Sequence, residues 1–135
     1  MYVDANAWIY ARDEASRWNE LRAFLSHAHQ GAWKLVTSEL SLAEVLVFPI
    51  RQRDRRAQTE FQQLIQNAPF LVVAPVSRAV LLEAAILRAT RSLEMPDAIH
   101  AATAKLTRCS HFLTGDEELA RAVHLPVLSV DFGSH

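Results

Sequence analysis

Hydrophobic and polar residues follow two recurring patterns along the chain. Short apolar runs alternate with longer segments in which apolar residues recur every three or four positions, the period of one helix face. The run at residues 70–74 is continuously apolar and ends at Pro75, which favours a strand buried on both faces. Strands are therefore expected at residues 1–3, 34–37, 70–74, 111–113 and 126–129.

The longer segments predict the helices. Pro49 should end the helix that begins at Ser41, because proline disfavours helical backbone in the residue before it. The segment 97–106 is rich in alanine and should pack closely against its neighbours. Helices are expected at residues 7–10, 14–29, 41–48, 51–67, 77–90, 97–106 and 117–122.

Strands that alternate with helices predict a parallel sheet covered on both sides. The expected class is α/β, a three-layer α/β/α fold with a short, mainly parallel central sheet. With only 3 Gly and 5 Pro and no linker-like stretch, residues 1–135 should form a single domain. Ligands of such sheets bind where the carboxyl ends of the strands meet the helices, so polar residues at those turns are the first candidates for a site.

Composition excludes several classes of protein. With 50% hydrophobic and 21% charged residues, the chain is too apolar to be disordered, and no apolar stretch reaches the ~20 residues of a membrane span. The N-terminus begins directly with strand-like sequence, so no signal peptide is expected. Cys109 is the single cysteine and cannot form an intrachain disulfide, so a reducing, cytoplasmic setting is expected.

Four acids are candidates for a site at the carboxyl edge of the predicted sheet. Asp4 and Asp116 each follow a predicted strand, Glu44 lies about one and a half turns into the helix after the second strand, and Asp97 opens the alanine-rich helix. Each has a simpler explanation as a helix N-terminal acid, and Ser41 with Glu44 matches a capping box. Capping needs no partner acid, however, whereas three of these acids should converge on one edge of one sheet.

Converging carboxylates need a counter-charge. Two of them ~4 Å apart repel by about 4 kcal/mol at an effective dielectric constant of ~20. A hard divalent cation such as Mg²⁺ relieves this, because it takes oxygen ligands and is commonly held by carboxylates together with substrate phosphate. No Cys or His cluster has zinc-ligand spacing. The pattern indicates metal-assisted attack on a phosphodiester.

Four motifs in order resemble the PIN-domain nucleases, particularly the VapC-type toxins of bacterial toxin–antitoxin pairs. The resemblance spans essentially the whole chain at spacings typical of that family. Read from the sequence, the motifs are Met1-Tyr-Val-Asp-Ala-Asn6, Ser38-Glu-Leu-Ser-Leu-Ala-Glu44, Met95-Pro-Asp97-Ala-Ile-His-Ala-Ala-Thr-Ala and Phe112-Leu-Thr114-Gly-Asp116. The resemblance implies a Mg²⁺- or Mn²⁺-dependent endoribonuclease that is usually dimeric and is held inactive by an antitoxin encoded beside it.

The resemblance also assigns residues. It implies that Asp4, Glu44 and Asp97 are the principal catalytic and metal-binding acids and that Asp116 is a fourth, more variable one. Asp4 and Asp97 are the preferred direct ligands, whereas Glu44 and Asp116 ligate directly, act through water or orient the nucleophile. The supporting polar residues are Asn6 and Thr114, and Ala5 is a small departure from the family pattern, which often has a hydroxyl residue there.

An arginine cluster and a histidine each have two interpretations. The basic cluster of Arg51, Arg53, Arg55 and Arg56 is either an exposed helix start or a patch that contacts RNA or a partner. His100 lies one helical turn after Asp97, but a lone histidine is more often packed than ligating, so it is left out of the expected site.

Other functions remain to be separated. A PIN-type RNA-processing nuclease without an antitoxin would carry the same acids, and a non-enzymatic receiver-like Mg²⁺-binding module would use a similar pocket. The receiver needs a lysine after a late strand, and the chain has only Lys34 and Lys105. A haloacid-dehalogenase-type phosphatase would need an Asp where Asn6 stands.

The formal net charge of −1 conceals an uneven distribution of charge. Without the four candidate acids, 14 cations face 15 − 4 = 11 acids, so the rest of the chain has a formal charge of +3.

Overall fold

The computed structural model describes residues 1–12, 15–67, 70–114, 119, 123 and 126–129. In this part of the chain, parallel strands form one sheet in the order β3-β2-β1-β4-β5. The strands are β1 (Tyr2–Val3), β2 (Leu35–Ser38), β3 (Leu71–Ala74), β4 (Phe112–Thr114) and β5 (Val127–Ser129). The helices are α1 (Ala5–Arg12), α2 (Ala15–Gln30), α3 (Glu39–Arg51), α4 (Arg55–Asn67), α5 (Arg78–Arg91) and α6 (Met95–Leu106).

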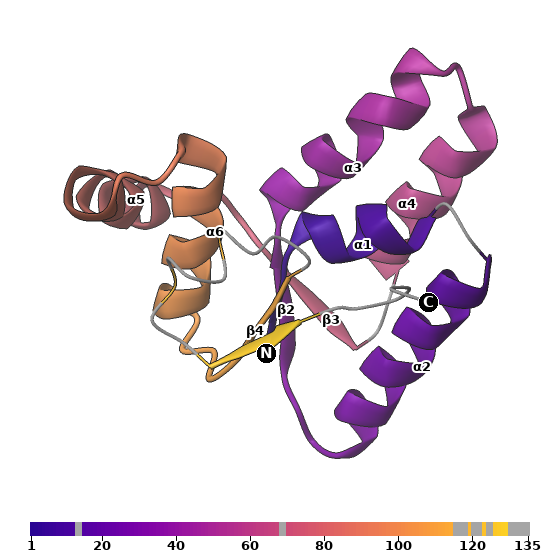
Figure 1. The fold of residues 1–135 in the computed structure, drawn as a ribbon, viewed down its shortest axis with the longest axis horizontal. Helices are drawn as coiled ribbons and strands as arrows, with labels where there is room; N and C mark the ends of the chain where they lie inside the picture. The colour runs from indigo at the N-terminus through magenta and orange to yellow at the C-terminus, as the bar shows by residue number, and fades with distance from the viewer. Residues whose placement is uncertain (13–14, 68–69, 115–118, 120–122, 124–125, 130–135) are drawn as a thin grey trace.

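Helices cover both faces of the sheet, so the predicted three-layer α/β/α architecture is confirmed (Figure 1). Successive residues of a strand point to opposite faces. Tyr2 therefore packs in the cluster that includes α5 and α6, and Val3 packs in the cluster that includes α1 to α4. Both side chains are fully buried. The sheet is thus the middle of two cores, one on each face.

The strand order reverses at β1. The chain passes from β1 outward to β2 and β3, and then returns to place β4 on the other side of β1. Residue 2 pairs with Val36 on one side and with Phe112 on the other. In open parallel sheets, the crevice at such a reversal is where ligands bind. Asp4, which directly follows β1, and Thr114, which ends β4, lie at this position.

Two expectations about the elements are wrong. Residues 71–74 are not buried on both faces: β3 is at the edge of the sheet and Val72 is 49% exposed. The helix expected to stop before Pro49 continues to Arg51 as α3, with Pro49 buried in its last turn. Only two further residues of α3 follow the proline, and its carbonyl accepts the backbone N–H of Asp54 at 2.9 Å. Proline in a last turn disturbs little of the helix.

The other boundaries agree within a few residues, except that α4 begins at Arg55 instead of Arg51. The helix expected at 117–122 falls almost entirely outside the described residues. None of the helices that the structure describes is both long and apolar enough to cross a membrane.

Candidate active site at the carboxyl edge of the sheet

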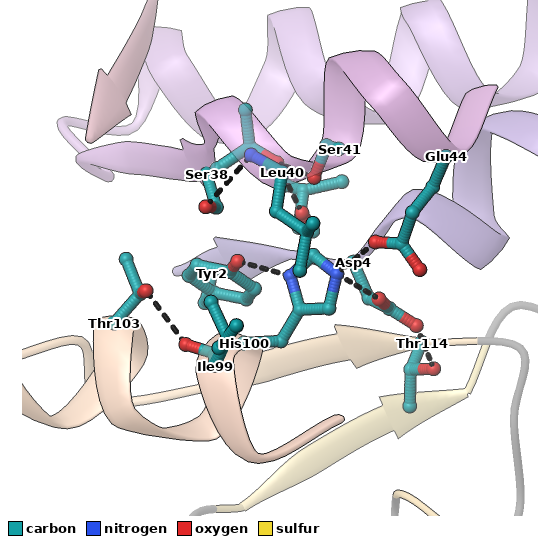
Figure 2. Close-up of polar contacts among 12 residues, drawn as sticks. Tyr2, Asp4, Ser38, Leu40, Ser41, Glu44, Ile99, His100, Thr103 and Thr114 are labelled. Atoms are coloured by element: carbon teal, nitrogen blue, oxygen red, sulfur yellow. Dashed lines mark hydrogen bonds and ion pairs between the residues drawn. The ribbon is translucent and has the colours of Figure 1, made fainter. Parts of the chain in front are cut away.

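Asp4 is a buried carboxylate at the reversal of the strand order. Its side chain is about 2% exposed. The hydroxyl of Thr114 donates to its Oδ2 at 2.8 Å, and its Oδ1 lies 3.6 Å from Nε2 of His100 (Figure 2). Parallel pairing of β1 and β4 brings these residues together across 110 positions of sequence. Thr114 thus holds one oxygen of Asp4, and the imidazole of His100 lies near the other.

Glu44 reaches the same place from α3. Ser38 is the N-cap of this helix, and its hydroxyl accepts the backbone N–H of Leu40 at 3.0 Å. The alternative interpretation of Ser41 and Glu44 as a capping box does not hold, because the helix already begins at Glu39. The carboxylate of Glu44 instead accepts a hydrogen bond from Nε2 of His100, and its side chain is 32% exposed.

His100 contacts both carboxylates, although the sequence prediction placed it outside the site. Its side chain is 1% exposed, Nε2 faces both acids, and Nδ1 lies 2.5 Å from the hydroxyl of Tyr2 (Figure 2). The alanines of α6 explain how an imidazole fits there, because small side chains let the helix approach the sheet. The available signal was its spacing: residues three apart share a helix face, so His100 lies beside Asp97.

Tyr2 closes the polar group from the sheet side. Its ring stacks on Phe112 with centroids 5.0 Å apart and meets His100 edge-on at 5.7 Å. Burial, together with the negative charges of Asp4 and Glu44, raises the pKa of the Tyr2 phenol well above its usual range. The hydroxyl therefore keeps its proton at neutral pH.

The structure describes the remaining predicted site residues to different extents. Asp97 is the third residue of α6, in its first turn and half-buried. Asp116 lies outside the described residues. Asn6 belongs to the first turn of α1, and its side chain is likewise outside the description. The structure thus brings together Asp4, Glu44 and Thr114 and adds His100, while the roles of the acids stay predictions.

Two of the predicted acids offer the kind of oxygen ligand that suits a hard divalent cation. Among the described residues, no three His, Cys, Asp or Glu side chains gather in a group that could hold a metal ion. Asp4 and Glu44 do supply two carboxylates that face one nitrogen, and carboxylate oxygens are the ligands that Mg²⁺ prefers. No thiol lies among these contacts, which disfavours a structural zinc site. Asp97 is the described acid that could complete the set.

The arginine cluster lies at the far end of α3. Arg51 ends α3, Arg53 lies in the turn that follows and Arg55 begins α4, and all are exposed. Arg56 is also exposed and pairs with Glu60 at 3.2 Å. Arg51 follows Glu44 by seven residues, which places it on the same side of the helix ~10.5 Å further along. The cluster is therefore separate from the acids but reached along one helix.

The fold and these carboxylates define a class of protein: a three-layer α/β chain whose acidic site lies where an all-parallel sheet reverses its strand order. Within that class, the chain belongs to the PIN domain family, which it matches over residues 1–125. The resemblance inferred from the four motifs is thereby confirmed. PIN domains are generally nucleases.

Solved structures share this fold over nearly their whole length. FitAcB from Neisseria gonorrhoeae superposes with a TM-score of 0.72 at 17% identity, covering 96% of this chain and 96% of that chain. A toxin–antitoxin complex from Klebsiella pneumoniae gives 0.65 at 22%, covering 96% and 97%. VapBC2 from Rickettsia felis, bound to a DNA fragment from its promoter, gives 0.71 at 16%, covering 96% and 98%. No curated protein sequence matches the chain significantly.

Proposed function

We propose that this protein is a Mg²⁺- or Mn²⁺-dependent endoribonuclease that serves as the toxin of a toxin–antitoxin pair. The observation that carries the proposal is the convergence of Asp4 and Glu44 on Nε2 of His100, at the edge of the sheet where ligands bind. Membership of the PIN domain family supports nuclease chemistry at that edge.

The cation would be held by Asp4 and Asp97, with Glu44 and Asp116 binding it directly or through water. When bound, a divalent cation lowers the pKa of a coordinated water and offsets the charge that develops on the phosphate. Thr114 holds Asp4 through its hydroxyl, so this carboxylate is oriented before any ligand arrives. The products are a phosphate monoester and a free hydroxyl, one on each side of the cut.

The proposed partners are an antitoxin and a second copy of the chain. Two chains in the structural comparisons come from a toxin–antitoxin complex and from VapBC2, which supports an antitoxin partner. Large apolar side chains are exposed on two helices, which supports protein contacts there. They are Val47, Phe48 and Ile50 on α3 and Leu81, Leu82 and Ile86 on α5. We propose that the protein acts in the cytoplasm, the compartment expected from its single cysteine.

A receiver-like regulatory module is the weaker alternative. Such a module needs a lysine at the acidic edge. Lys105, near the end of α6, donates to Glu83 at 2.5 Å, and Lys34 precedes β2 at the amino edge of the sheet. Neither lysine is positioned for that role.

Cleavage by the purified chain tests the nuclease proposal. We expect RNA to be cut with Mg²⁺ or Mn²⁺ and not with EDTA. Asp4→Asn and Asp97→Asn should each lower the rate at least ~100-fold, because even residues that only support metal ligands cost 10–100-fold when changed. Glu60→Gln, an exposed acid on α4, is the matched control and should cleave normally. Cleavage that survives both chelation and these substitutions would contradict the proposal.

Growth separates a toxin from an RNA-processing enzyme. Expression of the chain alone should arrest growth and produce new RNA ends, and co-expression of a small neighbouring gene with a DNA-binding N-terminus should restore growth. Asp4→Ala should cause neither arrest nor new ends. Cleavage in vitro without growth arrest would instead favour the RNA-processing nuclease.

A further inference from the structure

The imidazole of His100 lies in the site but takes no part in the metal chemistry of the proposed function. His100 is almost fully buried, and both of its ring nitrogens contact polar groups on other elements. Nδ1 faces the hydroxyl of Tyr2 on β1, and Nε2 faces Glu44 on α3 and Asp4 after β1. The imidazole thus connects α6, α3 and β1 at the point where the acids meet (Figure 2).

The hydrogen-bond donors along this connection can be assigned. An ionised carboxylate only accepts, so Nε2 must carry the hydrogen that it shares with Glu44. This is so whether the ring is neutral or cationic. In the neutral ring Nδ1 is then an acceptor, and the protonated phenol of Tyr2 donates to it.

Glu44 needs such support because its side chain is long and partly exposed. With 32% of the side chain in contact with solvent, a glutamate has several rotamers that would turn its carboxylate away from Asp4. The bond from Nε2 favours the rotamer that faces the buried acid. A histidine locked by a second partner is itself well oriented, which is the usual arrangement around metal ligands.

We propose that His100, oriented by the Tyr2 hydroxyl, is a positioning residue that holds the Glu44 carboxylate beside Asp4 and so forms one side of the cation site before the cation binds. This inference rests on the proposed function, because the proposed function is what makes this group of residues a cation site. It adds Tyr2 and His100 to the residues on which metal affinity depends, although neither is an acid.

A matched pair of amides tests this role. Glutamine places an N–H near the position of Nε2, whereas asparagine is one methylene shorter and places its amide near Nδ1, within reach of Tyr2 but not of Glu44. We expect Mn²⁺, followed by electron paramagnetic resonance or calorimetry, to bind His100→Asn about 10–100-fold more weakly than the wild type and His100→Gln within about threefold of it. Equal loss in both variants would overturn the proposal.

A double-mutant cycle distinguishes positioning from a merely structural role. If His100 acts through Glu44, His100→Asn should weaken Mn²⁺ binding by less than about threefold in a Glu44→Gln background. Independent losses that multiply would contradict the proposal. Tyr2→Phe removes only the hydroxyl and keeps the stack on Phe112, so it should weaken Mn²⁺ binding in the same direction as His100→Asn.

The wild-type chain without metal provides a test that does not depend on nuclease activity. Long-range ¹⁵N NMR of the histidine rings, with His100 identified by its absence from the His100→Gln spectrum, should show hydrogen on Nε2. A bare Nε2 would overturn the proposal. Failure of the wild type to bind Mn²⁺ while Nε2 carries hydrogen would count against the proposed function and leave the contact of His100 with Glu44 supported.

Discussion

At the scale of single residues, Asp4 shows how the fold tolerates a charge in its interior. Its carboxylate is almost fully buried, a position that is costly unless hydrogen bonds and opposite charges compensate. Thr114 supplies a hydroxyl to one oxygen, and the imidazole of His100 approaches the other. The acid is therefore fixed in place by its neighbours.

Removal of the Thr114 hydroxyl should expose the cost of that burial. Thr114→Val keeps the shape of the side chain but leaves Asp4 without this donor, and a hydrogen bond to a charged group contributes about 1.5–3 kcal/mol. We expect the free energy of unfolding, measured with urea in EDTA, to fall by that amount. Thr114→Ser keeps the hydroxyl and should lose only about 0.8 kcal/mol for one buried CH₂-sized group. A valine variant as stable as the serine variant would contradict this.

The candidate site could be anticipated only in part. Asp4 and Glu44 were predictable because each follows a strand of the sheet. The carboxyl ends of parallel strands lie at the same edge, so the two acids were expected to lie close together. The contacts of His100 were not predictable, because its partners Tyr2 and Glu44 are 98 and 56 residues away in sequence. The spacing of His100 from Asp97 indicates a shared helix face, but it does not indicate that both ring nitrogens have partners. Those partners depend on how α6 packs against β1 and α3.

At the scale of elements, the way α3 begins determines where Glu44 lies. Ser38 caps this helix and lowers the pKa of the nearby Tyr2 phenol against the larger effect of burial, so the start of α3 lies beside the same polar group that Glu44 reaches from its second turn. A shift of the helix start would move Glu44 with it. The cap is therefore part of the geometry of the site.

A matched pair of N-caps tests this coupling. Ser38→Ala and Ser77→Ala, which changes the N-cap of α5, should each lower the free energy of unfolding by about 1 kcal/mol. Only Ser38→Ala should also slow RNA cleavage, because Ser77 lies on a helix that carries no site residue. Stability is measured by urea unfolding and cleavage at saturating Mg²⁺. Equal rates in the two variants would show that the cap of α3 serves the helix alone.

The elements were largely predictable, and the two errors have physical causes. Apolar period and strand–helix alternation determine the α/β class, since a parallel sheet must be covered on both faces. An apolar run cannot reveal that its strand is at the edge, as for Val72, because exposure depends on which strands are neighbours. Pro49 was read as a helix stop, yet a proline in a last turn displaces few hydrogen bonds.

At the scale of the whole molecule, charge is separated along α3. Glu44 lies near the start of α3, close to Asp4, and the exposed arginines follow at the end of α3 and at the start of α4. A bound cation at the acids would leave the whole region attractive to phosphate. The near-zero net charge of the chain therefore conceals a surface that suits a polyanion.

The salt dependence of RNA binding measures whether the arginines contact phosphate. For single strands, each phosphate contact adds ~0.7 to the slope of log affinity against log salt. In an Asp4→Asn background that prevents cleavage, Arg51→Gln with Arg55→Gln should weaken binding and lower this slope by up to ~1.4. Arg78→Gln with Arg88→Gln, at the two ends of α5, removes the same charge from equally exposed positions and is the control. If both pairs lower the slope equally, the arginines attract RNA only through net charge, and α3 does not guide it to the acids.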